Sequence, residues 1–198
     1  MQLTRKFYEE SNVEVLSKKL LAKKLVTNFN GVITAGFITE VEAYSGRNDK
    51  ACHANNGLRT PRTEVMYGAG GHAYVYLCYG IHHMINIVSN VEEQADAVLI
   101  RAFEPIEGID AMLERRGFDK LTKALTSGPG NVGKALGLDT KTHNGLSLLG
   151  NEIWIEDQPE VSEEQIITST RIGVDYAEED ALKPWRFYIK DSKWVSKK

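Results

Sequence analysis

The most constraining feature of this sequence is a long stretch, from Val32 to Tyr44, in which successive side chains alternate between two sets. One set consists of Ile33, Ala35, Phe37, Thr39 and Val41, and the other contains Ile38, Glu40, Glu42 and Tyr44. A period of two residues is typical of a β-strand, because neighbouring side chains point to opposite faces. The stretch therefore predicts a long strand, which we expect to bend at Gly36.

Further strands are predicted along the chain, several of them with short connections. Two runs rich in apolar and aromatic residues, 73 to 79 and 84 to 90, flank the segment Gly80 to His83 and predict a hairpin. Other candidate strands are Ala97 to Ala102, Glu152 to Ile155, Gln165 to Thr170 and Arg186 to Ile189. A four-residue hairpin loop would pair Leu77 with Asn86, which places Asn86 and Tyr76 on opposite faces.

Helices are predicted around these strands. Apolar residues at helical spacing follow Asn12, a residue that favours the N-cap, and predict a helix over residues 12 to 26. A second helix is expected to open at Pro105 and close at Gly117, with short helical pieces around residues 127 to 130. Local strand connections with peripheral helices indicate an α+β fold, with a curved, mainly antiparallel sheet in a single domain over residues 1 to 198.

Composition excludes several classes of protein. Of the 198 residues, 42% are hydrophobic and 26% are charged, which is near the globular average and excludes global disorder. No run reaches the roughly 18 apolar residues of a membrane helix, and no apolar signal core follows Met1, so we expect a cytoplasmic protein with no membrane contact. Two cysteines, Cys52 and Cys78, are expected to be buried thiols and not a disulfide.

Charge is distributed unevenly. The net charge of -3, from 24 basic and 27 acidic residues, would by itself argue against a nucleic-acid partner, because basic patches drive phosphate binding. Residues 1 to 30 nevertheless carry six basic and three acidic side chains, a second basic group lies at residues 115 to 123, and acids concentrate from Glu152 to Asp180. This split permits one positive face, although charge runs that merely face water are the commoner explanation.

Two segments carry residues suited to chemistry. Glu40 to Tyr44 places two carboxylates and a tyrosine at a strand end, beside a glycine-rich loop over residues 45 to 71, and loops of that length are usually functional. A buried carboxylate there could act as a general base; the alternative is that both glutamates face water. His72 to Gly80 contains three tyrosines, which could stack on nucleic-acid bases or pack in the core.

Metal and nucleophile sites are not indicated. Four histidines, His53, His72, His82 and His83, accompany the two cysteines, but none has the spacing of a zinc site. No Gly-x-Ser-x-Gly motif occurs, and Ser127 to Gly130 lacks the ending of a P-loop. That segment could still direct backbone amides at one phosphate, or simply begin a helix. We expect no metal and no cofactor.

Short motifs follow one another along the chain in an order that identifies a protein family more specifically than any one of them does. The motifs are Glu42-Ala43-Tyr44, Ala51-Cys52-His53-Ala54, Arg59-Thr60-Pro61-Arg62, Met66-Tyr67-Gly68, Gly71-His72-Ala73-Tyr74-Val75-Tyr76, Tyr79-Gly80, Asn86, Val98-Leu99-Ile100-Arg101-Ala102, Glu104-Pro105 and Ser127-Gly128-Pro129-Gly130. Together they resemble the alkyladenine (3-methyladenine) DNA glycosylase family, in its bacterial form, over about residues 12 to 190.

This resemblance implies a DNA glycosylase of base excision repair that uses no metal or organic cofactor. Such an enzyme flips alkylated or deaminated purines (3-methyladenine, 7-methylguanine, hypoxanthine, ethenoadenine) out of duplex DNA and hydrolyses the N-glycosidic bond, leaving an abasic site. The implied fold is a single α+β domain similar to formyltransferase C-terminal domains. We expect a monomer that binds damaged double-stranded DNA and is associated with the nucleoid.

The resemblance also implies roles for seven residues. Glu42 matches the general base, Tyr44, His53 and Tyr76 match the side chains that enclose the flipped base, Tyr79 matches the wedge that fills the vacated stack, Asn86 matches the residue that obstructs a guanine amino group, and Arg101 matches a basic residue at the site. Asn86 and Tyr76 can line one pocket only with a bulge or a shifted register. The alternative function is a noncatalytic nucleic-acid-binding module on a related fold, for which Glu42 would be dispensable.

Overall fold

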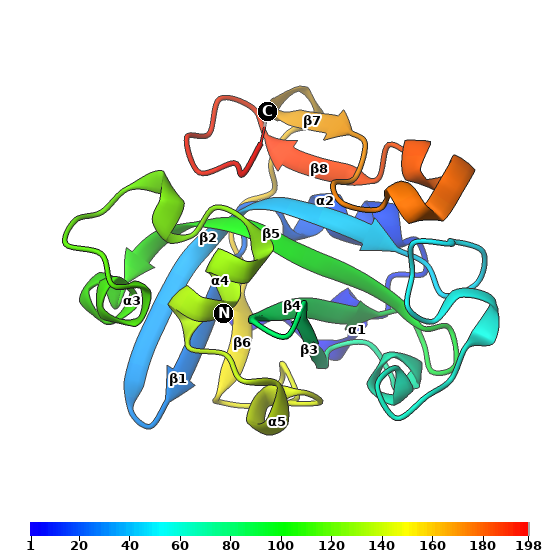
Figure 1. Ribbon diagram of the computed structural model, residues 1–198, viewed down its shortest axis with the longest axis horizontal. Helices are drawn as coiled ribbons and strands as arrows, with labels where there is room; N and C mark the ends of the chain where they lie inside the picture. The colour runs from blue at the N-terminus through cyan, green and yellow to red at the C-terminus, as the bar shows by residue number, and fades with distance from the viewer. Residues whose placement is uncertain (198) are drawn as a thin grey trace.

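The computed structural model describes residues 1–197, and its central feature is a sheet of eight strands that pair antiparallel throughout (Figure 1). The strands along the sheet are β3 (Ala73–Cys78), β4 (His82–Ser89), β5 (Asp96–Glu107), β2 (Val32–Tyr44), β1 (Lys24–Phe29) and β6 (Ile153–Glu156). The second half of β2 also pairs with β8 (Arg186–Ile189), which pairs with β7 (Ile166–Ser169). This arrangement confirms the predicted α+β fold and the long strand from Val32 to Tyr44.

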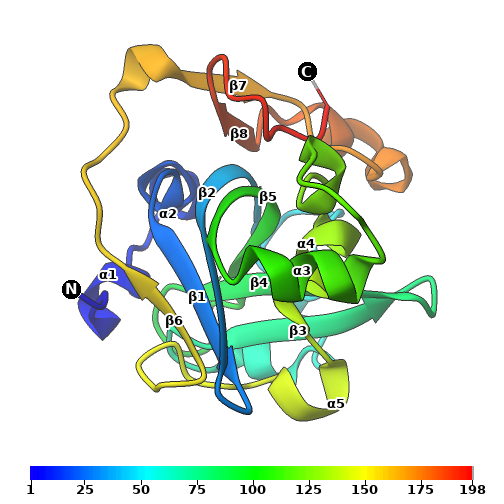
Figure 2. The same cartoon turned by 90° about the vertical axis from the view of Figure 1, so that its left-hand side faces the viewer.

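Short helices cover both faces of the sheet. The α-helices are α1 (Arg5–Tyr8), α2 (Val13–Leu20), α3 (Ile109–Arg116), α4 (Pro129–Leu136) and α5 (Thr140–His143). The 3₁₀ segments are η1 (Asn55–Gly57), η2 (Glu64–Tyr67), η3 (Lys123–Leu125), η4 (Glu163–Gln165) and η5 (Asp175–Leu182). Figure 2 shows α2 and α4 on opposite sides of β1, β2 and β5. Buried residues of both helices, such as Leu16 and Val132, belong to the main hydrophobic core together with Ile38 of β2.

The predicted helix over residues 12 to 26 is wrong in its second half. Asn12 caps α2 as expected, since its side chain accepts hydrogen bonds from the amides of residues 14 and 15, but the helix ends at Leu20 and Ala22 has a φ of 62°. Lys24–Phe29 instead pairs with the start of β2 across a turn formed by Asn30 and Gly31. An Asn-Gly pair between two β-prone runs is a strong hairpin signal, and the helical spacing of the leucines obscured it.

The predicted helix start at Pro105 is also wrong. β5 continues through Pro105 to Glu107, and α3 begins at Ile109 and ends before Gly117, as expected at that end. Pro105 is tolerated because it lies opposite Gly36, where the β2–β5 register shifts. Packing also requires glycine at position 36, since a Cβ there would collide with the Phe103 ring and the Glu104 carbonyl.

The β3–β4 hairpin has a shifted register relative to the simple expectation. Cys78 pairs with His82 and Tyr74 pairs with Asn86, so the loop between the strands has three residues instead of four. Directly paired residues share a face of the sheet, and Tyr76, two residues from Tyr74, shares that face too. The predicted separation of Asn86 from Tyr76 is therefore wrong, and both side chains can line one pocket. Among the other predicted strands, Arg186 to Ile189 has the observed bounds, and Glu152 to Ile155 and Gln165 to Thr170 differ from them by one residue at each end. The strand predicted over Ala97 to Ala102 begins one residue earlier and continues five residues further, to Glu107.

The two charged regions of the chain pair with each other. Lys18 bonds Glu163, Lys23 bonds Asp157 and Lys24 bonds Glu156, at 2.9, 2.7 and 3.5 Å respectively. Much of the basic group in residues 1 to 30 is therefore neutralised by the acidic segment after residue 152, and it does not form a separate positive face.

Candidate active site

A cavity of about 360 Å³ lies beside the β3–β4 hairpin, within the range of roughly 300 to 1,000 Å³ that is usual for small-molecule sites. Its wall comes from the ends of β2 to β5, from the loop after β2 and from the segment before η5. Six of the seven predicted site residues line it: Tyr44, His53, Tyr76, Tyr79, Asn86 and Arg101. The seventh, Glu42, is fully buried and hydrogen-bonded to two of these side chains. The structure thus brings all seven together, while their roles stay predictions.

Glu42 is held by three donors from three parts of the chain. Its Oε2 accepts hydrogen bonds from the Tyr44 hydroxyl at 2.8 Å and from Arg101 Nη1 at 3.1 Å, and its Oε1 accepts one from the backbone amide of Ile172 at 2.7 Å. This burial excludes the alternative in which Glu42 faces water. The three donors therefore occupy three of the roughly four acceptor sites of the carboxylate and fix its orientation.

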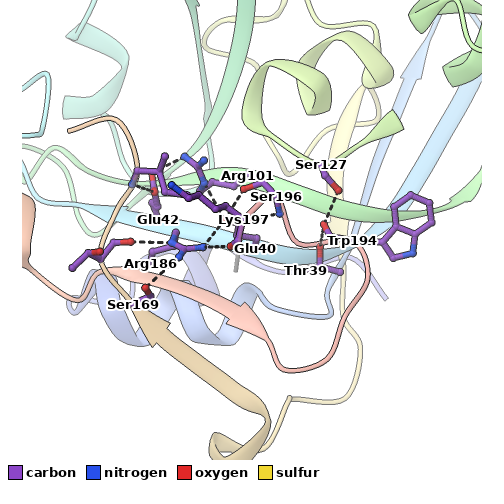
Figure 3. Close-up of polar contacts among 12 residues, drawn as sticks. Thr39, Glu40, Glu42, Arg101, Ser127, Ser169, Arg186, Trp194, Ser196 and Lys197 are labelled. Carbon is purple, nitrogen blue, oxygen red and sulfur yellow. Dashed lines mark hydrogen bonds and ion pairs between the residues drawn. The ribbon is translucent and has the colours of Figure 1, made fainter. Parts of the chain in front are cut away.

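Arg101 reaches the carboxylates through a break in the β2–β5 ladder. Glu40 lies opposite Ala102 and Val41 lies opposite Ile100, so Arg101 is the extra residue of a bulge. Bulges of this kind redirect side chains near functional sites. Figure 3 shows the result, in which Arg101 donates from Nε to Glu40 and from Nη1 to Glu42, both at 3.1 Å. Burial alone would lower the pKa of Arg101, but the Glu42 and Glu40 carboxylates raise it above its ordinary value.

Aromatic side chains in the cavity wall and directly behind it pack against one another. The rings of Tyr74 and Tyr76 are stacked with centroids 5.3 Å apart, and the His53 ring lies edge-on to Tyr76 at 4.7 Å. The guanidinium of Arg62 lies 4.9 Å from the Tyr76 ring centroid, within the range of cation–π contacts. These contacts hold flat, rigid surfaces at the cavity wall.

The hydrogen bonds of His53 define its protonation. Arg62 Nη2 can only donate, so His53 Nε2 at 3.2 Å accepts, and the ring proton lies on Nδ1, 2.9 Å from the Tyr74 hydroxyl. Burial, together with the Arg62 charge, lowers the pKa of His53 to about 4. His53 is therefore neutral near pH 7.

Asn86 is buried on the same face of the hairpin. Its side-chain Nδ2 donates a hydrogen bond of 3.1 Å to the backbone carbonyl of Tyr74. The bond fixes the orientation of the amide, because only the NH₂ end can donate to a carbonyl.

Tyr79 stands at the tip of the same hairpin and is 87% exposed. Its φ is 51° and that of Gly80 is 73°, with a hydrogen bond from the Ile81 amide to the Cys78 carbonyl. Turns with positive φ at both central residues favour Asn, Asp or Gly at the first of them. A large aromatic side chain at this position is uncommon, and it projects into solvent beside Ile81, which is 71% exposed.

Known proteins resemble this chain over its whole length. The sequence pattern of the family described as methylpurine-DNA glycosylase (MPG) matches residues 6–193. The chain belongs to the methylpurine-DNA glycosylase family. Three bacterial relatives carry the name "Putative 3-methyladenine DNA glycosylase". The one from Clostridium acetobutylicum is 48% identical over 99% of this chain and 98% of its own length. Those from Alkaliphilus oremlandii and Bacillus cytotoxicus are 48% and 47% identical over 100% and 96% of this chain, and over 100% and 97% of their own.

Membership in this family makes the chain a hydrolase of the N-glycosidic bond in DNA repair, as the motifs predicted.

No group of three or more His, Cys, Asp and Glu side chains in residues 1–197 could hold a metal ion. Both cysteines are free, as expected, but only Cys52 is buried, and its burial raises the pKa of the thiol to about 12. The expected burial of Cys78 is wrong, because this side chain is half-buried at the end of β3 and lines the cavity. None of the helices in the described part of the chain is long and apolar enough to cross a membrane.

Several residues of this glycosylase site escaped the sequence analysis. Arg62 lies in the motif 59–62, but nothing in that motif indicates its contacts with His53 and Tyr76. Arg171 bonds Asp49 through two nitrogens, at 2.6 and 2.7 Å, and lies 4.8 Å from the Tyr44 ring centroid. It thereby joins the loop after β2 to the segment that supplies the Ile172 amide. No local pattern could reveal a backbone donor that lies 130 positions from its acceptor in the chain.

Proposed function

We propose that this glycosylase flips alkylated or deaminated purines out of duplex DNA and hydrolyses their N-glycosidic bond with a water molecule activated by Glu42. The substrates are 3-methyladenine, 7-methylguanine, hypoxanthine and ethenoadenine. The observation that carries the proposal is a fully buried carboxylate hydrogen-bonded to two residues that line an aromatic cavity. The enzyme acts as one domain over residues 1 to 198, as a monomer and without a cofactor.

Glu42 has the acceptor capacity that this role requires. A carboxylate offers about four acceptor sites, and three of them are taken by the donors described above. The remaining site, on Oε1, accepts a proton of the attacking water. As the water oxygen bonds to C1′, the C1′–N bond breaks, its electron pair leaves with the purine, and Glu42 takes the proton. The negative charge of Glu42 also favours the positive charge that develops on the sugar.

The cavity and the hairpin supply the two other requirements. Extrusion of a nucleotide costs a few kcal/mol, and a side chain that fills the gap lowers that cost; Tyr79 is exposed and fixed at a turn for this purpose. Tyr44, His53 and Tyr76 then enclose the extruded base, and Asn86, which lines the same cavity, obstructs the guanine amino group.

The decisive experiment is a single-turnover incubation with duplexes that each contain one of the four bases, scored by abasic-site formation. A preparation of Glu42→Gln, purified in the same way, controls for a contaminating glycosylase. We expect abasic sites with the unaltered protein and almost none with the variant. Binding of lesion duplexes without base release by either protein would instead support the noncatalytic module.

A further inference from the structure

A second buried carboxylate, Glu40, lies two residues before Glu42 on β2 and is as completely buried. Its Oε1 accepts hydrogen bonds from Arg101 Nε at 3.1 Å, from Arg186 Nη1 at 3.0 Å and from Ser196 Oγ at 2.9 Å. Its Oε2 accepts one from the Ser196 amide at 2.6 Å. Neither glutamate lines the cavity, but Glu42 bonds two of the side chains that do, Tyr44 and Arg101, whereas Glu40 bonds Arg101 alone among them.

Arg101 connects this carboxylate to Glu42. One guanidinium group donates to both, from Nε to Glu40 and from Nη1 to Glu42 (Figure 3). A guanidinium is planar and rigid, so fixing one nitrogen fixes the directions of the others. The position of Arg101 at Glu42 therefore depends on its bond to Glu40.

The last described residues of the chain hold Glu40 from the other side. Trp194 and Val195 are buried, and the Trp194 carbonyl accepts hydrogen bonds from Thr39 Oγ1 at 3.3 Å and from Ser127 Oγ at 3.1 Å. The Lys197 carbonyl accepts one from Arg186 at 2.8 Å. Residues 194–197 thus form a strap across β2 that ends on the Glu40 carboxylate (Figure 3).

We propose that Glu40, held by the strap of residues 194–197, is a positioning residue that acts through Arg101 on Glu42. This inference rests on the proposed function, because it takes Glu42 as the base. Stability alone is a weak reason for a buried ion pair, because well-packed apolar residues in its place often stabilise a protein equally well or better. Here the pairing with Glu40 orients Arg101, which donates to Oε2 of Glu42, while Oε1 keeps the acceptor site assigned to the attacking water.

The pH dependence of the rate distinguishes a positioning role of Glu40 from a merely structural one, because only the positioning role couples the charge of Glu40 to Glu42. The charged and titratable groups around the two carboxylates are Arg101 from β5, Arg186 from β8, Tyr44 from β2 and Arg171 from the segment before η5. Glu40→Gln removes one negative charge. The positive charge of Arg101 is then paired with the Glu42 carboxylate alone and no longer with two carboxylates. Ionised Glu42 becomes better stabilised and a weaker base, and the acid limb of the rate profile moves to lower pH.

The experiment measures single-turnover rates on a hypoxanthine duplex across the acid limb for the unaltered protein and for E40Q. We expect the plateau rate to fall roughly 10- to 100-fold, by analogy with groups that orient metal ligands. The acid limb should move to lower pH, and lesion-duplex affinity should stay within about twofold. The control is Glu107→Gln, the same chemical change at the last residue of β5, where Glu107 pairs with Lys24. This variant should leave the pH profile unchanged.

Two outcomes would overturn the inference. One is a profile for E40Q that parallels the unaltered protein, with a rate loss that matches only the fraction of unfolded protein. The other comes from Ser196→Pro, which removes both donors of the strap to Glu40, the hydroxyl and the amide N–H, without changing the charge. An unaltered rate in that variant would show that the strap does not act on the site. Undiminished turnover by Glu42→Gln would instead refute the proposed base, a result that does not depend on Glu40.

Discussion

The hydroxyl of Tyr44 donates a hydrogen bond of 2.8 Å to Oε2 of Glu42, two residues earlier on the same strand. Burial, followed by the Glu42 charge, raises the pKa of Tyr44 well above its usual value, so the hydroxyl keeps its proton. The same Tyr44 side chain lines the cavity. One side chain therefore links the surface that would stack on a base to the carboxylate that would activate the attacking water.

Glu42→Gln should separate catalysis from binding. The amide cannot take a proton from water, so we expect the single-turnover rate to fall by about 10² to 10⁴, the usual loss for a general base. The structure also predicts a cost in stability of about 1 to 3 kcal/mol, because the new NH₂ group must face donors such as the Ile172 amide or Arg101. Rates and lesion-duplex affinities are measured below the melting temperature of the variant. A folded variant with the original rate would contradict the assignment.

Tyr79→Asn should uncouple stability from function. Asparagine adopts positive φ more easily than tyrosine, and Tyr79 has a φ of 51° and little packing, so the free energy of unfolding should stay equal or rise by up to about 1 kcal/mol. Loss of the ring should weaken lesion-duplex binding by roughly 1 to 3 kcal/mol. Urea unfolding and duplex titration measure the two effects. Tyr79→Phe keeps the ring and should bind nearly as the original does; equal losses in both variants would argue against the wedge.

Asn86→Ser should relax discrimination against guanine. The observed register places Asn86 on the face of Tyr76, and its bond to the Tyr74 carbonyl keeps the amide in place. A shorter side chain opens space for an exocyclic amino group, so the rate ratio of 7-methylguanine to hypoxanthine should rise by about tenfold or more. The ratio is compared in one sequence context. If both rates fall together and the ratio stays fixed, Asn86 serves the hairpin and not selectivity.

Strands and motifs could be predicted from this sequence because their signals are local. The alternation before Tyr44 identified β2, and the order of motifs named the site residues. The register of the hairpin could not be predicted, because it depends on the conformation of Tyr79 and Gly80 in the turn. The environment of Glu42 depends on a bulge at Arg101 and on the amide of Ile172, and both are consequences of distant pairing.

His53 should make stability depend on pH. In the folded protein its pKa is about 4, against an ordinary value of 6.5, because it is buried next to Arg62. Between these two values the unfolded chain binds more protons than the folded one, so stability is lost as the pH falls from about 6.5 to about 4, by up to about 3 kcal/mol. His53→Gln can still accept from Arg62 and donate to Tyr74, yet it does not titrate. Urea unfolding at a series of pH values should therefore show a shallower decline in the variant than in the original, since all other titrating groups are shared. Parallel declines would mean that His53 takes up its proton in the folded protein as readily as in the unfolded chain, and that the bonds assigned to its neutral ring are wrong.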